Sequence, residues 1–298
     1  MKLNLIALVT LLPFLPVSAK SQPVLILAGY GYRLPANSIT AAPGQILAVS
    51  ILGLPYIGTD IDIPVMGPEG WPLAIRGLSV TLVQSSISKR LQLRGVQQMC
   101  GVSPKCPETT TLTVQMPYEL EVGAPAILEF RHNEVLAATT TVKLVTDQVH
   151  ILNSCDQTGV SGVSAAMCLP VVTHADGSLV SGIQPARPGE RLVLWAFGMG
   201  AVDRDFQPEC CSRPELVPVV RQPFTVGLFY TSGADQPFGR LASLIPLFAG
   251  APWPGMYQVQ FDVPPAPEDM APCNGGSNLR ILINGPSSAD TADVCLAR

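Results

Sequence analysis

The sequence has few charged residues and very few histidines. Charged side chains make up 13% of the 298 residues, and the three histidines are His132, His150 and His174. The 18 lysines and arginines stand against 22 aspartates and glutamates, a balance that argues against a nucleic-acid partner. A disordered chain is also excluded, because 47% of the residues are hydrophobic and suffice for packed cores.

The sequence also lacks the motifs of common catalytic and metal sites. It contains no Cys-x-x-Cys pair and no Gly-x-Ser-x-Gly turn, which are signatures of zinc sites and of a hydrolase nucleophile. A set drawn from Ser178, His174 and Asp176 would crowd three groups onto one tight turn, where they cannot align for proton transfer. We therefore predict no catalytic residue, no metal site, no cofactor and no enzymatic activity.

Two Asp-x-Asp pairs come nearest to a cation site. They are Asp60 with Asp62 and Asp203 with Asp205, each following a hydrophobic run. Side chains two residues apart on an extended chain share one side, so each pair could contribute to a calcium site. Calcium takes about six to eight oxygens, and neither pair has a clustered third acid. We favour solvated loop carboxylates, with cation binding as the alternative.

The N-terminus carries the pattern of a secretory signal peptide. Lys2 precedes an apolar stretch from Leu3 to Val17, and Val17 and Ala19 occupy the small-residue positions before a cleavage site. The apolar stretch is too short to span a bilayer comfortably, and no later stretch has the length and apolarity of a membrane span. We expect residues 1–19 to be removed and the mature chain to be soluble and secreted or held at the extracellular surface, with the periplasm as the alternative.

All eight cysteines follow this segment, which in an exported chain indicates disulfides. In chain order they are Cys100, Cys106, Cys155, Cys168, Cys210, Cys211, Cys273 and Cys295. We predict that the first pairs with the second and the third with the fourth, as sequence neighbours. The last four allow Cys273–Cys295 with a vicinal Cys210–Cys211 bridge, or crosswise pairing, and the sequence leaves both patterns open.

One phrase occurs twice in the chain. Residues 40–54, "TAAPGQILAVSILGL", and residues 185–200, "PARPGERLVLWAFGMG", both place Pro-Gly and a polar residue before a hydrophobic run that stops at glycine. Each Pro-Gly pair fits a turn that leads into a strand.

A second landmark repeats at nearly the same distance. "LTVQMP" ends at Pro117 and "VQFDVP" ends at Pro264, which is 147 residues later, whereas Pro43 and Pro188 are 145 residues apart. Two landmarks with nearly one offset indicate a tandem duplication. We place a first domain at residues 20–147 and a second at 148–298, with the boundary within residues 145–150.

The periodicity of the chain is that of β-strands. In "MYQVQFDVP", residues 256–264, apolar and polar side chains alternate as they do on a strand with one packed face. The run "RLVLWAFG", residues 191–198, is apolar on both faces and suits a central strand, with Trp195 in the core. The 29 prolines and 26 glycines add many turns. The sequence therefore predicts an all-β protein of two tandem β-sandwiches.

Three runs in the second half resemble a known family. They are "HADGSLVS" (174–181), "PARPGERLVLWAFGMGAVD" (185–203) and "AGAPWPGMYQVQFDVP" (249–264). They are similar to an uncharacterised domain family of acidobacterial secreted proteins, the Solibacter-type C-terminal domain, whose runs read "HxDGSLV…NPAxPGExVxLxxTGLG" and "YAGxAPGxxGxYQVNxxVP". Here Ile183-Gln184-Pro185 replaces the usual Asn-Pro, and Phe248 takes the place of the tyrosine before Ala249-Gly250.

The resemblance covers most of residues 40–298 and is strong between residues 170 and 285. It implies immunoglobulin-like domains of the IPT/TIG kind and an exported location, and it implies no particular activity.

Two loop tryptophans are the candidate binding residues. Trp71 in "PEGWPL" and Trp253 in "APWPGM" each precede a proline in a Gly/Pro-rich loop. Such a ring could stack on a sugar or on an apolar patch of a partner, or it could plug the loop back onto the core.

We predict a non-catalytic exported module, either binding or structural, that contacts a surface protein or a polysaccharide through its loops. One alternative is an exported hydrolase or an accessory domain of a polysaccharide-acting enzyme. Another is a purely structural segment of an envelope assembly.

Overall fold

The computed structural model describes residues 25–29, 39–58, 60–63, 70–85, 87–99, 109–154, 156, 168–204, 214–232, 239–273 and 277–297. The regular elements in these ranges are β-strands and one 3-10 helix, Pro214–Leu216. Several sequence predictions fall outside the described residues: the signal peptide at 1–19, Asp205, and Cys100, Cys106, Cys155, Cys210 and Cys211. The all-β prediction is confirmed for the described ranges.

The first half of the chain forms two sheets. One has the order β1 (Leu25–Gly29), β3 (Ile46–Leu52), β8 (Thr109–Gln115), β7 (Gln92–Met99) and β4 (Ile61–Asp62). The other has the order β2 (Ile39–Ala41), β10 (Val135–Leu144), β9 (Pro125–His132), β5 (Leu78–Gln84) and β6 (Ile87–Arg90). Neighbouring strands are antiparallel, except that β2 is parallel to β10. A cluster of buried apolar side chains from both sheets lies between them.

The second half of the chain repeats this two-layer plan. One sheet has the order β11 (His150–Ile151), β13 (Arg191–Phe197), β17 (Met256–Asp262) and β16 (Phe248–Trp253), with β12 (Val172–His174) also paired to β13. The facing sheet has the order β15 (Gly239–Leu244), β14 (Thr225–Tyr230), β18 (Leu279–Asn284) and β19 (Ala289–Val294). Their inner faces enclose a second apolar cluster.

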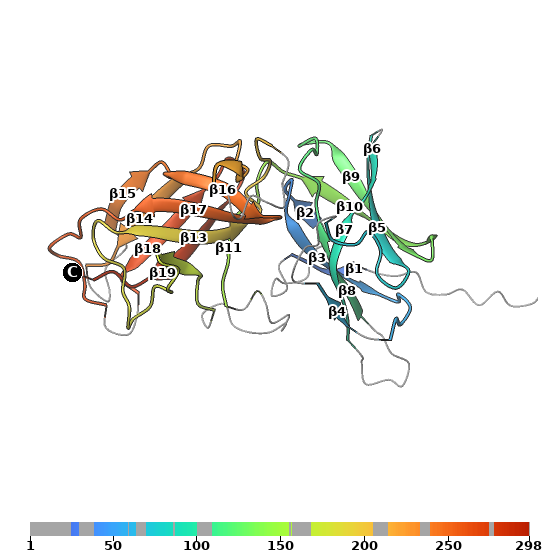
Figure 1. Cartoon of the computed structure of the whole chain (residues 1–298), viewed down its shortest axis with the longest axis horizontal. Helices are drawn as coiled ribbons and strands as arrows, with labels where there is room; N and C mark the ends of the chain where they lie inside the picture. The colour runs from blue at the N-terminus through green and yellow to red at the C-terminus, as the bar shows by residue number, and fades with distance from the viewer. Residues whose placement is uncertain are drawn as a thin grey trace, which may run out of the picture.

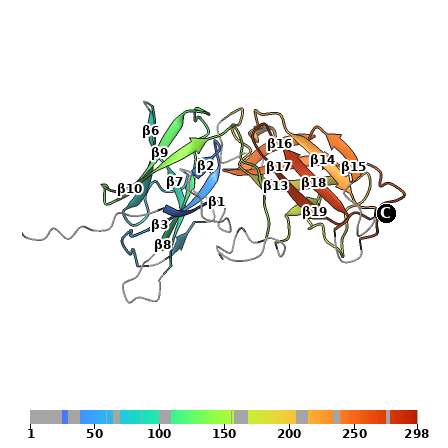
Figure 2. The same ribbon diagram turned by 180° about the vertical axis from the view of Figure 1, so that it is seen from behind.

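The two halves lie side by side along the longest axis of the molecule, and each contains its own pair of sheets (Figures 1 and 2). The first core cluster ends at Leu144 and the second begins at Val149. The change from one core cluster to the other therefore falls between Leu144 and Val149.

The repeated phrase folds twice into the same turn. Gln45 N donates to Ala42 O at 3.2 Å, and Glu190 N donates to Arg187 O at 3.1 Å. The glycines of the two turns have φ of +71° and +78°, the left-handed value that the third position of a Pro-Gly type II turn requires. Side chains close both turns in the same way, because Gln45 Oε1 accepts from Ala42 N and Glu190 Oε2 accepts from Arg187 N.

The strand after each turn pairs with the strand of the second landmark. β3 pairs with β8, and β13 pairs with β17. Gly44 N donates to Pro117 O at 3.1 Å, and Gly189 N donates to Val263 O at 2.7 Å. The repetition in the sequence thus corresponds to a repetition of turn, strand and partner strand.

Candidate functional site

Apolar side chains from both halves meet where the halves touch. Ile46 follows the first repeated turn, and Phe197 lies at the end of β13; both are buried in one cluster with Trp71. Met256, at the start of β17, packs against the same cluster. We call this group the junction cluster.

Trp71, a predicted binding residue, belongs to the junction cluster. Only 6% of its surface is exposed, and it packs with Ile46 and Phe197. Its ring is buried, as in the plug alternative, but it lies in the contact between the halves and not on the core of one half, and it is not presented to solvent.

Hydrogen bonds reinforce the junction beside this cluster. Gly255, in the turn between β16 and β17, donates its N–H to Tyr118 Oη at 3.0 Å. The connecting segment is anchored to the second half, because Asp147 accepts from Ser287 N at 2.9 Å and from Ser288 Oγ at 2.5 Å.

Trp253, the other predicted binding residue, is exposed at the end of β16. It keeps 43% of its surface exposed, and its ring lies against that of Trp195, with centroids 5.3 Å apart and planes inclined at 36°. The prediction that Trp195 lies in the core is wrong. Its neighbours Leu194 and Ala196 point into the core, so strand alternation places Trp195 on the outer face of the sheet.

Polar and aromatic side chains continue this outer face across three strands. Gln258 on β17 pairs with Trp195 on one side and with Gly250 of β16 on the other. The ring of Phe248 lies over Gly250, because a Cβ at that glycine would come within 2.5 Å of Phe248 Cζ. Gln260 lies opposite Phe248. We call Trp195, Trp253, Phe248, Gln258 and Gln260 the aromatic face.

The two glutamines of the aromatic face are half-buried. Neither amide has a hydrogen-bond partner among the described residues. The formal charges next to them, Arg191 and Asp262, pair with each other at 2.9 Å. The five side chains of the aromatic face therefore carry no formal charge, and its two amides make no hydrogen bond within the described residues.

A buried histidine lies close behind the junction cluster. The ring of His150 stacks on Phe197 at 6.4 Å, and 2% of its side chain is exposed. Its Nε2 lies 3.0 Å from Asp156 Oδ1, and its Nδ1 lies 3.3 Å from Asp290 Oδ2. Burial pulls the pKa of His150 down, but hydrogen bonds and charges from the two aspartates outweigh burial and leave this pKa raised.

The pKa of Asp290 is shifted in the opposite direction to that of His150. Burial raises its pKa, but His150 and the backbone N–H groups of Ile151 and Thr291 outweigh burial and leave the pKa lowered. Sequence reasoning did not identify this trio, because its members are separated by up to 140 residues and share no motif.

The residues of the turn at Asp176 do not form a proton relay. Ser178 Oγ donates to Asp176 Oδ1 at 2.7 Å, whereas His174 Nδ1 pairs with Glu190 Oε1. Glu190 is the residue that also closes the second repeated turn. His174 thus ties the hairpin to that turn.

The described members of the Asp-x-Asp pairs contact other groups of the protein. Asp60 Oδ1 accepts from Gln98 N at 2.6 Å, and Asp62 Oδ1 lies 3.8 Å from Arg94 Nε. Asp203 accepts from Val219 N and pairs with Arg204. Within the described residues, no group of three or more His, Cys, Asp or Glu side chains is placed to hold a metal ion.

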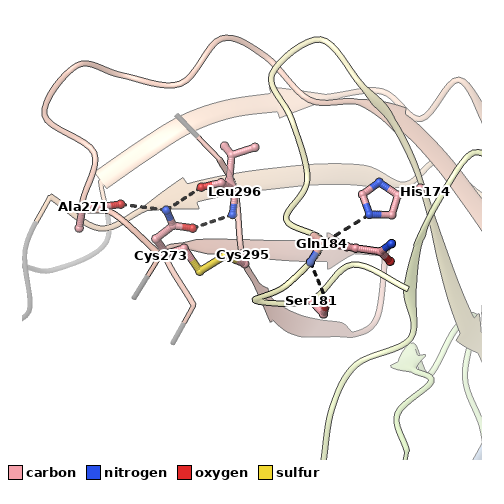
Figure 3. The surroundings of a disulfide bond; sticks show 8 residues. His174, Ser181, Gln184, Ala271, Cys273, Cys295 and Leu296 are labelled. Carbon is pink, nitrogen blue, oxygen red and sulfur yellow. Dashed lines mark hydrogen bonds between the residues drawn. A yellow bond between two sulfur atoms is a disulfide. The ribbon is translucent and has the colours of Figure 1, made fainter. Parts of the chain in front are cut away.

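The structure contains one of the bridges that the sequence left open. Cys273 is bonded to Cys295, with their Cα atoms 5.6 Å apart (Figure 3). Cys168 is also in a disulfide. Beside the Cys273–Cys295 bridge, the buried side chain of Asn278 donates to Ala271 O and Leu296 O and accepts from Leu296 N. The bridge and this amide hold the C-terminal segment to the sheet edge.

The part of the chain that the structure describes contains no helix with the length and apolarity of a membrane span. No protein-family model matches the chain, and no curated protein matches it.

Three solved structures illustrate what the chain is similar to. Bovine butyrophilin aligns over 89% of this chain and 97% of its own, at 10% identity and a TM-score of 0.24. DIP-gamma IG1+IG2 aligns over 94% and 99%, at 11% identity and a TM-score of 0.19. Domains 5–6 of the S-layer protein SbsC align over 93% and 99%, at 12% identity and a TM-score of 0.25. TM-scores this low carry no argument about the activity or partners of this chain.

Proposed function

We propose that the chain is an exported, non-catalytic binding module built of two tandem immunoglobulin-like sandwiches. The observation that carries this proposal is the aromatic face, where Trp253 is 43% exposed and rests on Trp195. An exposed indole held by a second ring on a sheet is a pre-formed contact surface, because little side-chain freedom is lost when a partner binds.

The disulfides support export, since such bonds persist in oxidising compartments. The signal-peptide pattern and the resemblance to the Solibacter-type C-terminal domain support the same location and the immunoglobulin-like class. In this proposal the first sandwich, the junction cluster and the second sandwich act as one scaffold that holds the aromatic face in place.

Binding to cell-envelope material tests the function. Purified mature chain is mixed with washed envelope fragments of the organism that produces it, and the bound fraction is measured by sedimentation. The wild type is expected to sediment with the fragments, and Trp253→Ala is expected to sediment less. A wild type that stays in the supernatant would overturn the binding function.

The same mixtures test the absence of catalysis. Release of reducing sugar ends, peptides or carboxylic acids at a rate that depends on the chain would contradict a non-catalytic module. The expected result is no release above that of the envelope fragments alone.

A further inference from the structure

The aromatic face combines two kinds of group that recognise sugars. Indole and phenyl rings offer flat apolar surfaces on which the C–H faces of a sugar ring can stack. Amide side chains offer both donors and acceptors to hydroxyl groups. Trp253, Trp195 and Phe248 supply the rings, and Gln258 and Gln260 supply the amides between them.

We propose that the aromatic face binds a neutral polysaccharide, running across β13, β17 and β16. This inference deepens the proposed function by naming the ligand class, and it rests on that function.

The charge of the surface favours a neutral chain over an anionic one. Arg191 and Asp262, which border the aromatic face, neutralise each other through their ion pair. The whole chain carries a formal net charge of −4, which repels anionic polymers. The five side chains that make up the aromatic face carry no formal charge of their own, so they offer a carboxylate or sulfate of the ligand no ion pair.

The extent of the surface suits a polymer better than a single sugar. Three neighbouring strands cover about 10 Å from the first strand to the third. The row from Trp195 through Gln258 to Gly250 crosses all three strands, and Phe248 covers the last position. A flat row of this length contacts several points along a chain and does not enclose a small molecule, which binds in a concave pocket.

The aromatic face is continuous with the contact between the two halves. Trp253 pairs with Met256 across the β16–β17 hairpin, and Met256 packs on the junction cluster. The turn of this hairpin is fixed to the first half by Tyr118. The position of Trp253 is therefore set by both halves of the chain.

Affinity electrophoresis tests the inference. The mature chain is run in native gels that contain hydroxyethylcellulose, galactomannan or laminarin as neutral probes, or alginate as the anionic probe. We expect at least one neutral polymer to retard the wild type and alginate to leave its mobility unchanged. Trp253→Ala should weaken the retardation about tenfold, the scale of one aromatic contact, and Gln258→Ala should weaken it to a smaller extent.

The control variant is Val135→Ala, which removes an apolar side chain that is 70% exposed on β10 of the first half. It should bind as the wild type does. Trp253→Phe, which keeps a ring, should retain part of the binding, and thermal unfolding of each variant verifies that it is folded.

Three outcomes would overturn the inference: no retardation by any neutral probe, retardation by alginate alone, or equal binding of Trp253→Ala and Val135→Ala. If the wild type sediments with envelope fragments but is not retarded by any neutral probe, the proposed sugar ligand is wrong and the proposed binding function is retained. If the wild type neither sediments with the fragments nor is retarded by a neutral probe, both the sugar ligand and the binding function are wrong.

Discussion

At the scale of single residues, His150 joins three parts of the chain that are distant in sequence. It lies on β11, its ring contacts Asp156 and Asp290, and it stacks on Phe197 of β13. Because Phe197 is in the junction cluster, the imidazole lies directly behind the contact between the two halves. A buried ring between two carboxylates is stabilised most in its protonated form.

The stability of the protein should therefore depend on pH through His150. Its pKa in the folded chain is raised above the ordinary value of 6.5, so its stabilising contribution is complete below pH 6.5 and is lost as the pH rises through the folded-state pKa. The free energy of unfolding, measured by urea denaturation at a series of pH values, should fall on this alkaline side. On the acid side, the lowered pKa of Asp290 predicts a separate loss below its ordinary value of 3.8.

His150→Gln should remove the alkaline decline. It should also lower the free energy of unfolding near pH 6 by about 3 kcal/mol, because the Asp156 carboxylate stays buried without its cationic partner. His132→Gln, a change of another histidine, should keep the decline of the wild type. An unchanged pH profile in His150→Gln would contradict the assignment.

At the scale of elements, the two Pro-Gly turns are alike in backbone and different in surroundings. Both glycines have positive φ, which costs a residue with a Cβ about 1–2 kcal/mol. A Cβ at Gly44 would also lie 2.0 Å from Cε1 of Tyr118, whereas a Cβ at Gly189 meets nothing within 4 Å. The turn of the first half is thus enclosed by the junction, and the turn of the second half faces open space.

Substituting each glycine separates these two effects. Gly189→Ala should lower the free energy of unfolding by about 1 kcal/mol through backbone strain alone. Gly44→Ala should lower it by about 3 kcal/mol, since displacement of the Tyr118 ring adds to the same strain. Urea denaturation of the two variants measures both losses, and equal losses would show that Tyr118 does not crowd the first turn.

The contribution of the Cys273–Cys295 bridge to stability can also be predicted. The cysteines are 22 residues apart in the sequence, and in the chain-entropy model a loop of this length is worth about 3 kcal/mol. Cys273→Ala/Cys295→Ala should lose that amount in urea denaturation. Each single variant should lose nearly as much, because either one removes the bond, and a wild-type stability in the double variant would contradict the estimate.

At the scale of the whole molecule, the two tryptophans chosen from the sequence have different positions. Both precede a proline in the sequence, but Trp71 is buried in the junction cluster, whereas Trp253 is the last residue of β16, not a loop residue as predicted, and is exposed on the aromatic face. Tyr118 and Gly255 join the halves on one side of that cluster. The structure therefore assigns the first tryptophan to the orientation of the halves and leaves the second open to a partner.

Alanine substitution should distinguish these roles. Trp71→Ala should lower the free energy of unfolding by about 3–5 kcal/mol, the cost of a large buried cavity, and should loosen the two halves. Small-angle X-ray scattering should then show a larger radius of gyration. Trp253→Ala should cost about 1 kcal/mol and leave the scattering curve unchanged. A larger loss of stability in Trp253→Ala than in Trp71→Ala would show that Trp253, and not Trp71, is the tryptophan that stabilises the fold.

The wrong prediction for Trp195 has a physical cause. Trp195 lies in a run that is apolar on both faces, which indicates a strand covered on both sides. The inner face of β13 packs on the core, as expected. Its outer face is covered where Phe197 contacts the first half and where the ring of Trp253 packs on Trp195. Composition alone does not distinguish a strand face that packs on the core from one that packs on another part of the chain. The alternation with Leu194 and Ala196 was the available signal that Trp195 faces outward.

The sequence by itself determined the strands, the paired turns and the repetition, because each depends on residues that are close along the chain. Period-two alternation, a Pro-Gly pair before an apolar run, and a second landmark at nearly one offset are all local patterns. Only the tertiary structure decided which tryptophan is buried, which cysteines pair and which carboxylates meet His150. Those outcomes depend on surfaces that folding brings together, as where Trp71 meets Phe197 and where His150 meets Asp290, and a local pattern carries no information about such contacts.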